Sequence, residues 1–214
     1  MEKGADRLIS ELYKKSRIVA MLAPSFVAQF DYPQIITQLK EFGIDKVVEL
    51  TFGAKMVNRE YHRLLKGAKK LMISSACPGI VETIRHKLPE FRDNLMPVDS
   101  PMIAMAKICK KFYPHHLTLF ISPCIFKKIE AMQSEYVDIV IGYNELEKLL
   151  EQHNILVEAG NAAVDDLGQR RLHPRNVAPQ PVFHRVVIHL RNERRNAVDH
   201  FGHHVAVRPH RGNI

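Results

Sequence analysis

Three features that this 214-residue sequence lacks restrict what the protein can be. It has no run of 18 apolar residues, so we expect no transmembrane helix. Its opening stretch, MEKGADRLISELYKKS, is charged and has no apolar centre, so it does not read as a secretory signal. Three cysteines are an odd number and do not indicate a disulfide framework; without an export signal, we expect reduced thiols in the cytoplasm.

Lysine is also absent from residues 156–214, which hold 9 arginines and 7 of the 12 histidines, whereas residues 1–155 hold 16 lysines and 6 arginines. One domain rarely changes its basic residues so completely. The net charge of +8 therefore does not by itself predict that residues 1–155 bind nucleic acid. Three interpretations of residues 156–214 stay open: a frameshifted or fused reading frame, a disordered basic appendage, and a small nucleic-acid-binding module, with the first two favoured.

Histidines gather near the end of this tail, in the stretch DHFGHH and beyond, at His200, His203, His204 and His210. Histidines at such spacing can ligate zinc. The arginines among them indicate a general compositional bias instead, because no apolar period predicts a fold that would hold the ligands. We therefore divide the chain into a lead-in at 1–16, a body at 17–155 and an Arg/His-rich tail at 156–214.

The body alternates between short apolar runs and segments with helical spacing. The predicted strands are residues 17–23, 45–52, 70–76, 116–122 and 136–142. The predicted helices are residues 31–43, 53–67, 78–91, 100–114 and 144–154. This alternation predicts an α/β fold with a mostly parallel sheet and helices on both faces.

Two of the three cysteines come directly after predicted strands, each beside a proline, in SSACPG and SPC. Because the ends of parallel strands gather at one edge of a sheet, we expect Cys77 and Cys124 in one crevice, with Lys127 and Lys128 nearby. Thiolates there suit zinc or an iron–sulfur cluster, although two buried structural thiols remain an alternative. A redox pair is less favoured because the sequence has no Cys-x-x-Cys. Cys109, inside a predicted helix, is expected to be a packing residue.

The segments LAPSF, ELTFGA, SSACPG, DSP and SPCIFKKIE follow one another in an order and spacing that are specific together. Through them, residues 17–155 resemble the C-terminal, cluster-binding domain of the iron-only (FeFe) hydrogenase large subunit. The resemblance implies one lobe of a domain that holds the H-cluster, a 4Fe-4S cubane linked through a cysteine to a two-iron centre with carbonyl and cyanide ligands. In that family the cofactor reduces protons to hydrogen or runs the reverse reaction.

The resemblance places roles on particular residues. Cys77 and Cys124 match two cubane ligands, and Lys127 matches the lysine that hydrogen-bonds a cyanide of the two-iron centre. A point charge beside an anionic ligand is strongly favourable in a dry pocket. The other cofactor-binding positions that the resemblance implies are Pro24, Ser25 and Ser75.

The sequence also departs from that family. Ala76 stands where the family has a second cysteine that carries protons, and an alanine cannot do so. Ser74, Ser122 and Met102 are milder changes. The family's two other cluster cysteines lie in a later Cys-x-x-x-Cys segment, but residues 156–214 contain no cysteine. No ferredoxin-like segment with accessory clusters precedes residue 17.

Three functional classes follow. The chain is part of a hydrogenase domain, or it derives from a non-catalytic redox or hydrogen sensor, or it is an α/β domain without a cofactor. Ala76 favours the sensor. We expect a cytoplasmic protein that by itself neither produces nor consumes hydrogen. The cofactor is an iron–sulfur cluster, or none in so short a chain, and the implied partner is a ferredoxin-like electron-transfer domain or protein.

Overall fold

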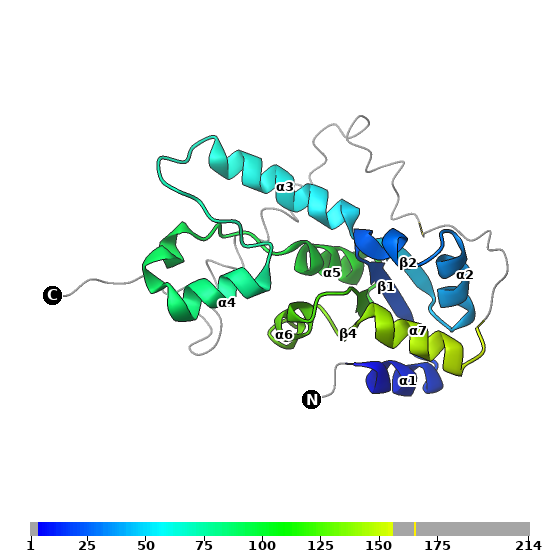
Figure 1. Ribbon diagram of the computed structural model, residues 1–214. Helices are drawn as coiled ribbons and strands as arrows, with labels where there is room; N and C mark the ends of the chain where they lie inside the picture. Colours follow the sequence, from blue (N-terminus) through cyan, green and yellow to red (C-terminus); the bar gives the residue numbers. More distant parts are fainter. Residues whose placement is uncertain (1–3, 156–164, 166–214) are drawn as a thin grey trace, which may run out of the picture.

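A four-stranded parallel sheet forms the centre of the protein, and helices cover both of its faces (Figure 1). The structure is a computed structural model, which describes residues 4–155 and Asp165. The strands are β1 (Ile18–Leu22), β2 (Lys46–Glu49), β3 (Leu117–Ile121) and β4 (Ile139–Ile141), in the spatial order β2-β1-β3-β4. The predicted α/β class is therefore confirmed, and the sheet among the described residues is wholly parallel.

Seven α-helices and two 3-10 helices surround the described sheet. The helices are α1 (Ala5–Tyr13), α2 (Gln34–Glu41), α3 (Thr51–Leu65), α4 (Pro78–Lys87), α5 (Pro101–Phe112), α6 (Phe126–Met132) and α7 (Tyr143–Gln152), and the 3-10 helices are η1 (Pro24–Ala28) and η2 (Pro89–Asn94). The sequence patterns did not predict α1 or α6. Among the described residues, no helix is long and apolar enough to cross a lipid bilayer.

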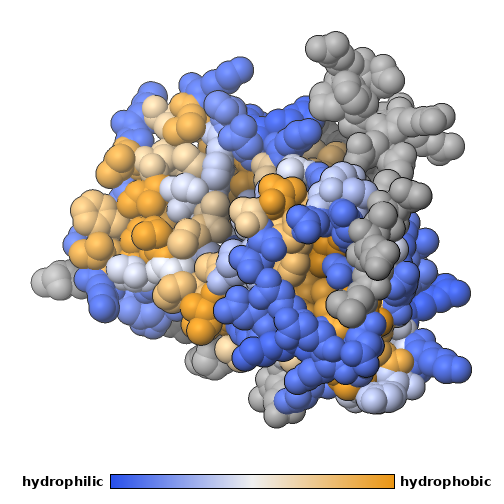
Figure 2. Space-filling view, turned by 45° about the vertical axis from the view of Figure 1, so that its right-hand side comes forward, coloured by the Kyte–Doolittle hydropathy of each residue, from blue (hydrophilic) through white to orange (hydrophobic). Residues whose placement is uncertain are grey.

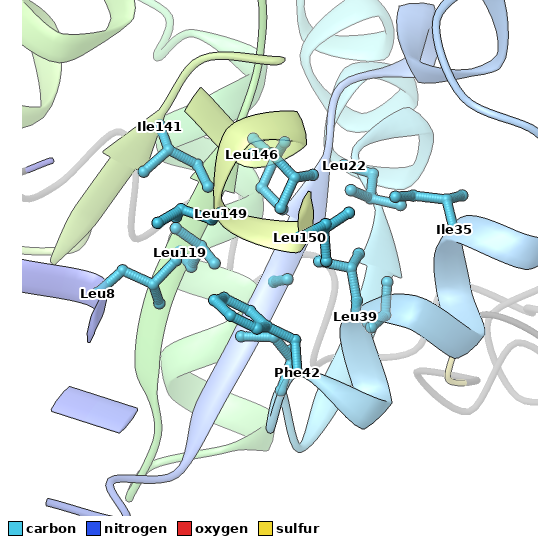
Figure 3. Packing of buried hydrophobic residues seen from close by; sticks show 14 of the residues in the cluster. Leu8, Leu22, Ile35, Leu39, Phe42, Leu119, Ile141, Leu146, Leu149 and Leu150 are labelled. Carbon is cyan, nitrogen blue, oxygen red and sulfur yellow. The ribbon is translucent and has the colours of Figure 1, made fainter. Parts of the chain in front are cut away.

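Strand β1 shows why the body reads as continuous apolar runs, because all five of its residues are buried. Ile18, Ala20 and Leu22 pack with α1, α2 and α7 on one face, whereas Val19 and Met21 pack with α3 and α5 on the other. A parallel strand covered on both faces needs apolar side chains at every position. Figure 3 shows the first of these cores, where leucines from α1, α2 and α7 converge over β1 and β3.

One of the five predicted strands is wrong. Residues 70–76 do not join the sheet; they make a single parallel bridge between Ile73 and Leu95. Leu71 is 64% exposed, and its carbonyl accepts a hydrogen bond from the Asn94 side chain. The apolar run Leu-Met-Ile therefore pairs with the loop after η2. A short apolar run does not reveal which partner strand it will find.

The free edge of the sheet is covered at one point by Asp165. Its carboxylate accepts a hydrogen bond from the backbone N–H of Val47 in β2 (2.8 Å), and its own N–H donates to the Val47 carbonyl (2.6 Å). The carboxylate also lies 3.0 Å from the ammonium of Lys40. Asp165 thus contacts the body from beyond the predicted boundary at residue 155. The histidine cluster of the tail lies outside the described residues.

Candidate functional site

Cys124 lies in the turn that leads from β3 into α6. The N–H of Ser122 donates to the carbonyl of Ile141 in β4, which anchors the start of this turn to the sheet. The hydroxyl of Ser122 then accepts a hydrogen bond from the N–H of Cys124 (3.2 Å), and the Cys124 carbonyl accepts from the N–H of Lys127. These bonds fix the backbone on both sides of a half-buried thiol.

Cys77 is the N-cap residue of α4, and Pro78 occupies the first helical position, as prolines often do. The hydroxyl of Ser74 accepts a hydrogen bond from the Ala76 N–H, while Ser75 donates to the carbonyl of Val98 (2.5 Å). The phenol of Tyr61, on α3, lies within hydrogen-bonding distance of both serine hydroxyls. Hydrogen bonds to Tyr61 and Val98 therefore hold the loop before Cys77 in place. The Cys77 thiol itself is exposed to solvent.

Lys127 joins the two cysteine loops. Its ammonium donates to the carbonyl of Ala76 (3.4 Å), the residue before Cys77, and forms an ion pair with Glu130 (2.7 Å). The side chain of Lys127 is only 12% exposed. A Cβ placed on Gly79 would lie 3.4 Å from the Phe126 ring, so the starts of α4 and α6 are also in contact. The two loops lie side by side, although the Cys77 loop does not follow a strand of the sheet.

Ser25 lies at the carboxyl edge of the sheet, as Cys124 does. The reason is that η1 directly follows β1, and β1 is the parallel neighbour of β3. The Ser25 hydroxyl is 2.7 Å from the hydroxyl of Tyr143, which also donates to the carbonyl of Ala23 (3.3 Å). Burial raises the pKa of Tyr143, and the hydrogen bond with Ser25 offsets only part of that effect. Ser25 is thus positioned by the first residue of α7, and among the described residues no printed hydrogen bond links it to the Cys77 loop.

Cys109 is a packing residue, as its position inside a predicted helix indicated. It is fully buried in the core between the sheet and α5. Burial raises its pKa to about 12, despite the positive charge of Lys110. A thiol in this state is a poor ligand and a poor nucleophile, because both roles need the thiolate.

The thiols at the site are the type of ligand that iron–sulfur clusters use, but there are too few of them. Cys77 and Cys124 offer two thiols, and a cubane cluster takes four. Within residues 4–155 and at Asp165, no group of three or more His, Cys, Asp or Glu side chains could hold a metal ion. The site therefore provides half of a ligand set.

Sequence patterns missed two residues that position this site. Glu130 neutralises Lys127, and its i,i+3 spacing was a visible signal. Tyr61 on α3 hydrogen-bonds with Ser74 and Ser75. No local sequence pattern predicts a contact between residues 13 positions apart.

Taken together, the chain is an α/β domain with two cysteine-bearing loops held side by side beside the edge of a parallel sheet. The family model for the iron only hydrogenase large subunit, C-terminal domain, matches residues 16–178. The chain belongs to this family. The matched span runs past residue 155, where we expected the resemblance to stop.

Individual proteins show the same relationship. The chain is 29% identical over 142 residues to iron hydrogenase 1 of Clostridium pasteurianum, covering 57% of this chain and 25% of that protein. It is 30% identical over 143 residues to the NADP-reducing hydrogenase subunit HndD of Solidesulfovibrio fructosivorans, covering 55% and 24%. A solved FeFe-hydrogenase, a variant of HydA1 from Chlamydomonas reinhardtii, matches with a TM-score of 0.66 and 20% identity, covering 76% of this chain and 50% of that one. The chain thus spans about a quarter of these curated relatives and half of that structure.

Proposed function

We propose that this chain binds an iron–sulfur cluster through Cys77 and Cys124, and that it serves redox or hydrogen sensing in place of hydrogen turnover. The observation that supports cluster binding most directly is the Lys127 bridge, which holds the two cysteine loops together. A cluster ligated here would supply one-electron redox chemistry. Its electron partner, in this proposal, is a ferredoxin-like domain or protein.

The residues around the thiols have distinct tasks in this proposal. The ammonium of Lys127 offsets negative charge near the thiolates, while Glu130 fixes its position. The hydroxyls of Ser74, Ser75 and Tyr61 hold the Cys77 loop in place. Ala76 carries no ionisable group, so nothing at this position can deliver a proton to a reacting centre. Loss of this proton donor removes turnover without removing a ligand, which favours sensing.

Anaerobic reconstitution with ferrous iron and sulfide tests cluster binding. We expect the protein to retain iron and sulfide after desalting, and to develop visible absorption and a paramagnetic signal on reduction. Cys77→Ser and Cys124→Ser should each lose most of the retained iron. Cys109→Ala is the matched control and should retain it, because Cys109 is buried in the core away from the site. Equal iron in wild type and the double variant Cys77→Ser/Cys124→Ser would instead support an α/β domain without a cofactor.

A further inference from the structure

One face of α3 carries a line of basic residues. Lys55, Arg59, His62 and Lys66 follow one another at intervals of three or four positions, and every one of them is exposed. Residues at this spacing lie on the same face of an α-helix, each about 5–6 Å from the next. From Lys55 to Lys66 the line runs roughly 16 Å along the helix axis. We call these four residues the α3 basic stripe.

The opposite face of α3 is buried. Gly53, Met56 and Val57 lie on that face, and Gly53 packs closely against Met105 of α5. Figure 1 shows α3 above α5 on the outside of the molecule, and Figure 2 shows that the upper edge, where α3 lies, is mostly hydrophilic with a few hydrophobic residues between. Because the core already covers the apolar face of α3, this helix has no such face left to insert into a lipid surface.

The positive charge of the stripe is not neutralised within the described structure. Lysines on other helices have acidic partners, as Lys128 of α6 has in Glu145. On α3 itself, Glu60 pairs with Arg63, which lies outside the stripe. Within the part of the chain that the structure describes, no member of the stripe forms an ion pair. Like charges at this spacing weaken a helix, so the stripe is unfavourable for α3 unless something anionic covers it.

The helix dipole accounts for only half of the stripe. His62 and Lys66 lie at the C-terminal end of α3, where positive charge is favourable. Lys55 and Arg59 lie in earlier turns, and the effect of the dipole is confined to the last turn. These two residues therefore need another explanation, and an anionic partner provides one.

The surroundings of the stripe favour a protein as that partner. Leu65, the neighbour of Lys66, is 48% exposed, and Leu71, shortly after the helix, is 64% exposed. Apolar side chains beside charged ones suit a protein interface, which combines apolar contacts with a polar rim. Nucleic-acid strands are often held by stacking on aromatic rings, but Phe52 and Tyr61 of α3 are not exposed. A second copy of this chain, placed by a two-fold axis, would bring like charges together.

We propose that the α3 basic stripe binds a partner protein that presents carboxylates along one face of a helix. Carboxylates three or four positions apart on such a helix repeat at the same spacing as the cations of the stripe. Charge complementarity of this kind steers the approach of the partner, and salt weakens it. Leu65 contacts apolar groups of the partner beside the ion pairs. The inference goes beyond the proposed function and requires no bound cluster.

Fluorescence anisotropy with two labelled helical peptides tests this inference on the metal-free, 214-residue chain. The first peptide carries its glutamates along one face, and the second has the same composition with the glutamates spread around the helix. At low ionic strength, we expect the chain to bind the first peptide about tenfold more tightly than the second. The difference should vanish at about 1 M salt, where charges are screened within about 3 Å.

Lys55→Glu reverses one charge of the stripe and should weaken binding of the first peptide by about tenfold or more. The substitution places an acidic residue in the N-terminal half of α3, and circular dichroism should show an unchanged fold. Lys148→Glu is the matched control, because Lys148 is exposed on α7, on the other side of the sheet. Its affinity should stay within about twofold of wild type, although its net charge changes equally.

Equal weakening by Lys55→Glu and Lys148→Glu would show a response to net charge alone and would overturn the stripe as a binding site. Equal affinity for the two peptides, or binding to neither, would overturn it as well. Tighter binding of a single-stranded DNA oligonucleotide than of the first peptide, with the same loss in Lys55→Glu, would assign the stripe to nucleic acid and overturn the protein partner. None of these outcomes depends on iron, so the proposed function is tested separately.

Discussion

Solvent exposure and pKa separate the three cysteines at the scale of single residues. Cys77 is exposed and Cys124 half-buried, whereas burial raises the pKa of Cys109 to about 12. Only the thiolate reacts with iodoacetamide. We expect the folded, metal-free protein at pH 8 to take up two labels quickly, and the urea-unfolded protein to take up three. Intact mass spectrometry measures the difference.

Cys77→Ser and Cys109→Ser are the paired controls for this labelling. The first should reduce rapid labelling by one, and the second should leave it unchanged. Rapid modification of Cys109 in the folded protein would contradict its burial. Slow modification of Cys124 would show that its turn is closed, and that the thiol is not available as a ligand.

At the scale of secondary-structure elements, the close packing of α3 against α5 can be tested at Gly53. A Cβ on Gly53 would lie 2.8 Å from the Cβ of Met105 and 2.9 Å from the carbonyl oxygen of Pro101, closer than real contacts allow. Gly53→Ala should therefore lower the free energy of unfolding by about 1–3 kcal/mol, the usual cost of overpacking. Urea denaturation should show a lower midpoint with an unchanged slope.

Gly67, just after α3, provides the matched glycine. A Cβ there meets nothing within 4 Å. Gly67→Ala should change the free energy of unfolding by less than about 0.5 kcal/mol. Equal destabilisation by the two substitutions would contradict the assignment of the Gly53 effect to the close approach of α3 and α5.

The start of α7 predicts a dependence on pH. Burial raises the pKa of Glu145, but hydrogen bonds from Lys128 and from the Gly142 N–H outweigh it, so the pKa lies below its ordinary value of 4.5. A carboxylate with a lowered pKa stabilises the fold above that ordinary value and loses this contribution as the pH falls through the folded pKa. Glu145→Gln should lower Tm at pH 7.

For this variant, the difference in Tm from wild type should shrink progressively below pH 4.5, as measured by circular dichroism. Glu151→Gln on the exposed side of α7 is the control, and its Tm should follow wild type at every pH. A Glu145 difference that persists unchanged in acid would show that side-chain packing, and not charge, anchors this helix.

At the scale of the whole molecule, we expect that this chain neither evolves nor consumes hydrogen. Two thiolates can supply only half of the protein ligands that a cubane takes, and Ala76 provides no proton donor. General acid–base catalysis typically contributes ~100- to 10,000-fold to a rate, so its loss leaves little activity. Gas chromatography after reconstitution with iron, sulfide and a two-iron precursor, with reduced methyl viologen as electron donor, should detect no hydrogen above a metal-free sample.

Ala76→Cys sharpens this prediction, because it restores a thiol at the position of the missing proton donor. We expect no hydrogen from this variant either, since the ligand set is still incomplete in each chain. Robust hydrogen production by the wild-type polypeptide would contradict both the sensing role and the assigned importance of Ala76.

Local patterns in the sequence are enough to locate most strands of the sheet and to single out the two cysteine turns. Four of the five predicted strands form, because a parallel strand buried on both faces needs an unbroken apolar run, and that run is a local property. Cys109 was correctly placed in a helix core by its apolar neighbours. Cys77 and Cys124 were singled out as residues that directly follow strands; Cys124 does follow β3, but the segment before Cys77 is not a strand of the sheet.

How those turns come together depends on contacts between segments that are distant in the sequence. The Cys77 loop reaches Cys124 through the Lys127–Ala76 bond and the packing of Gly79 on Phe126, and not through a strand at residues 70–76. The closure of the β2 edge by Asp165 is likewise a contact across more than a hundred residues. Such pairings leave no period in the sequence, because they depend on which distant segments the folded chain brings within a few ångströms of one another.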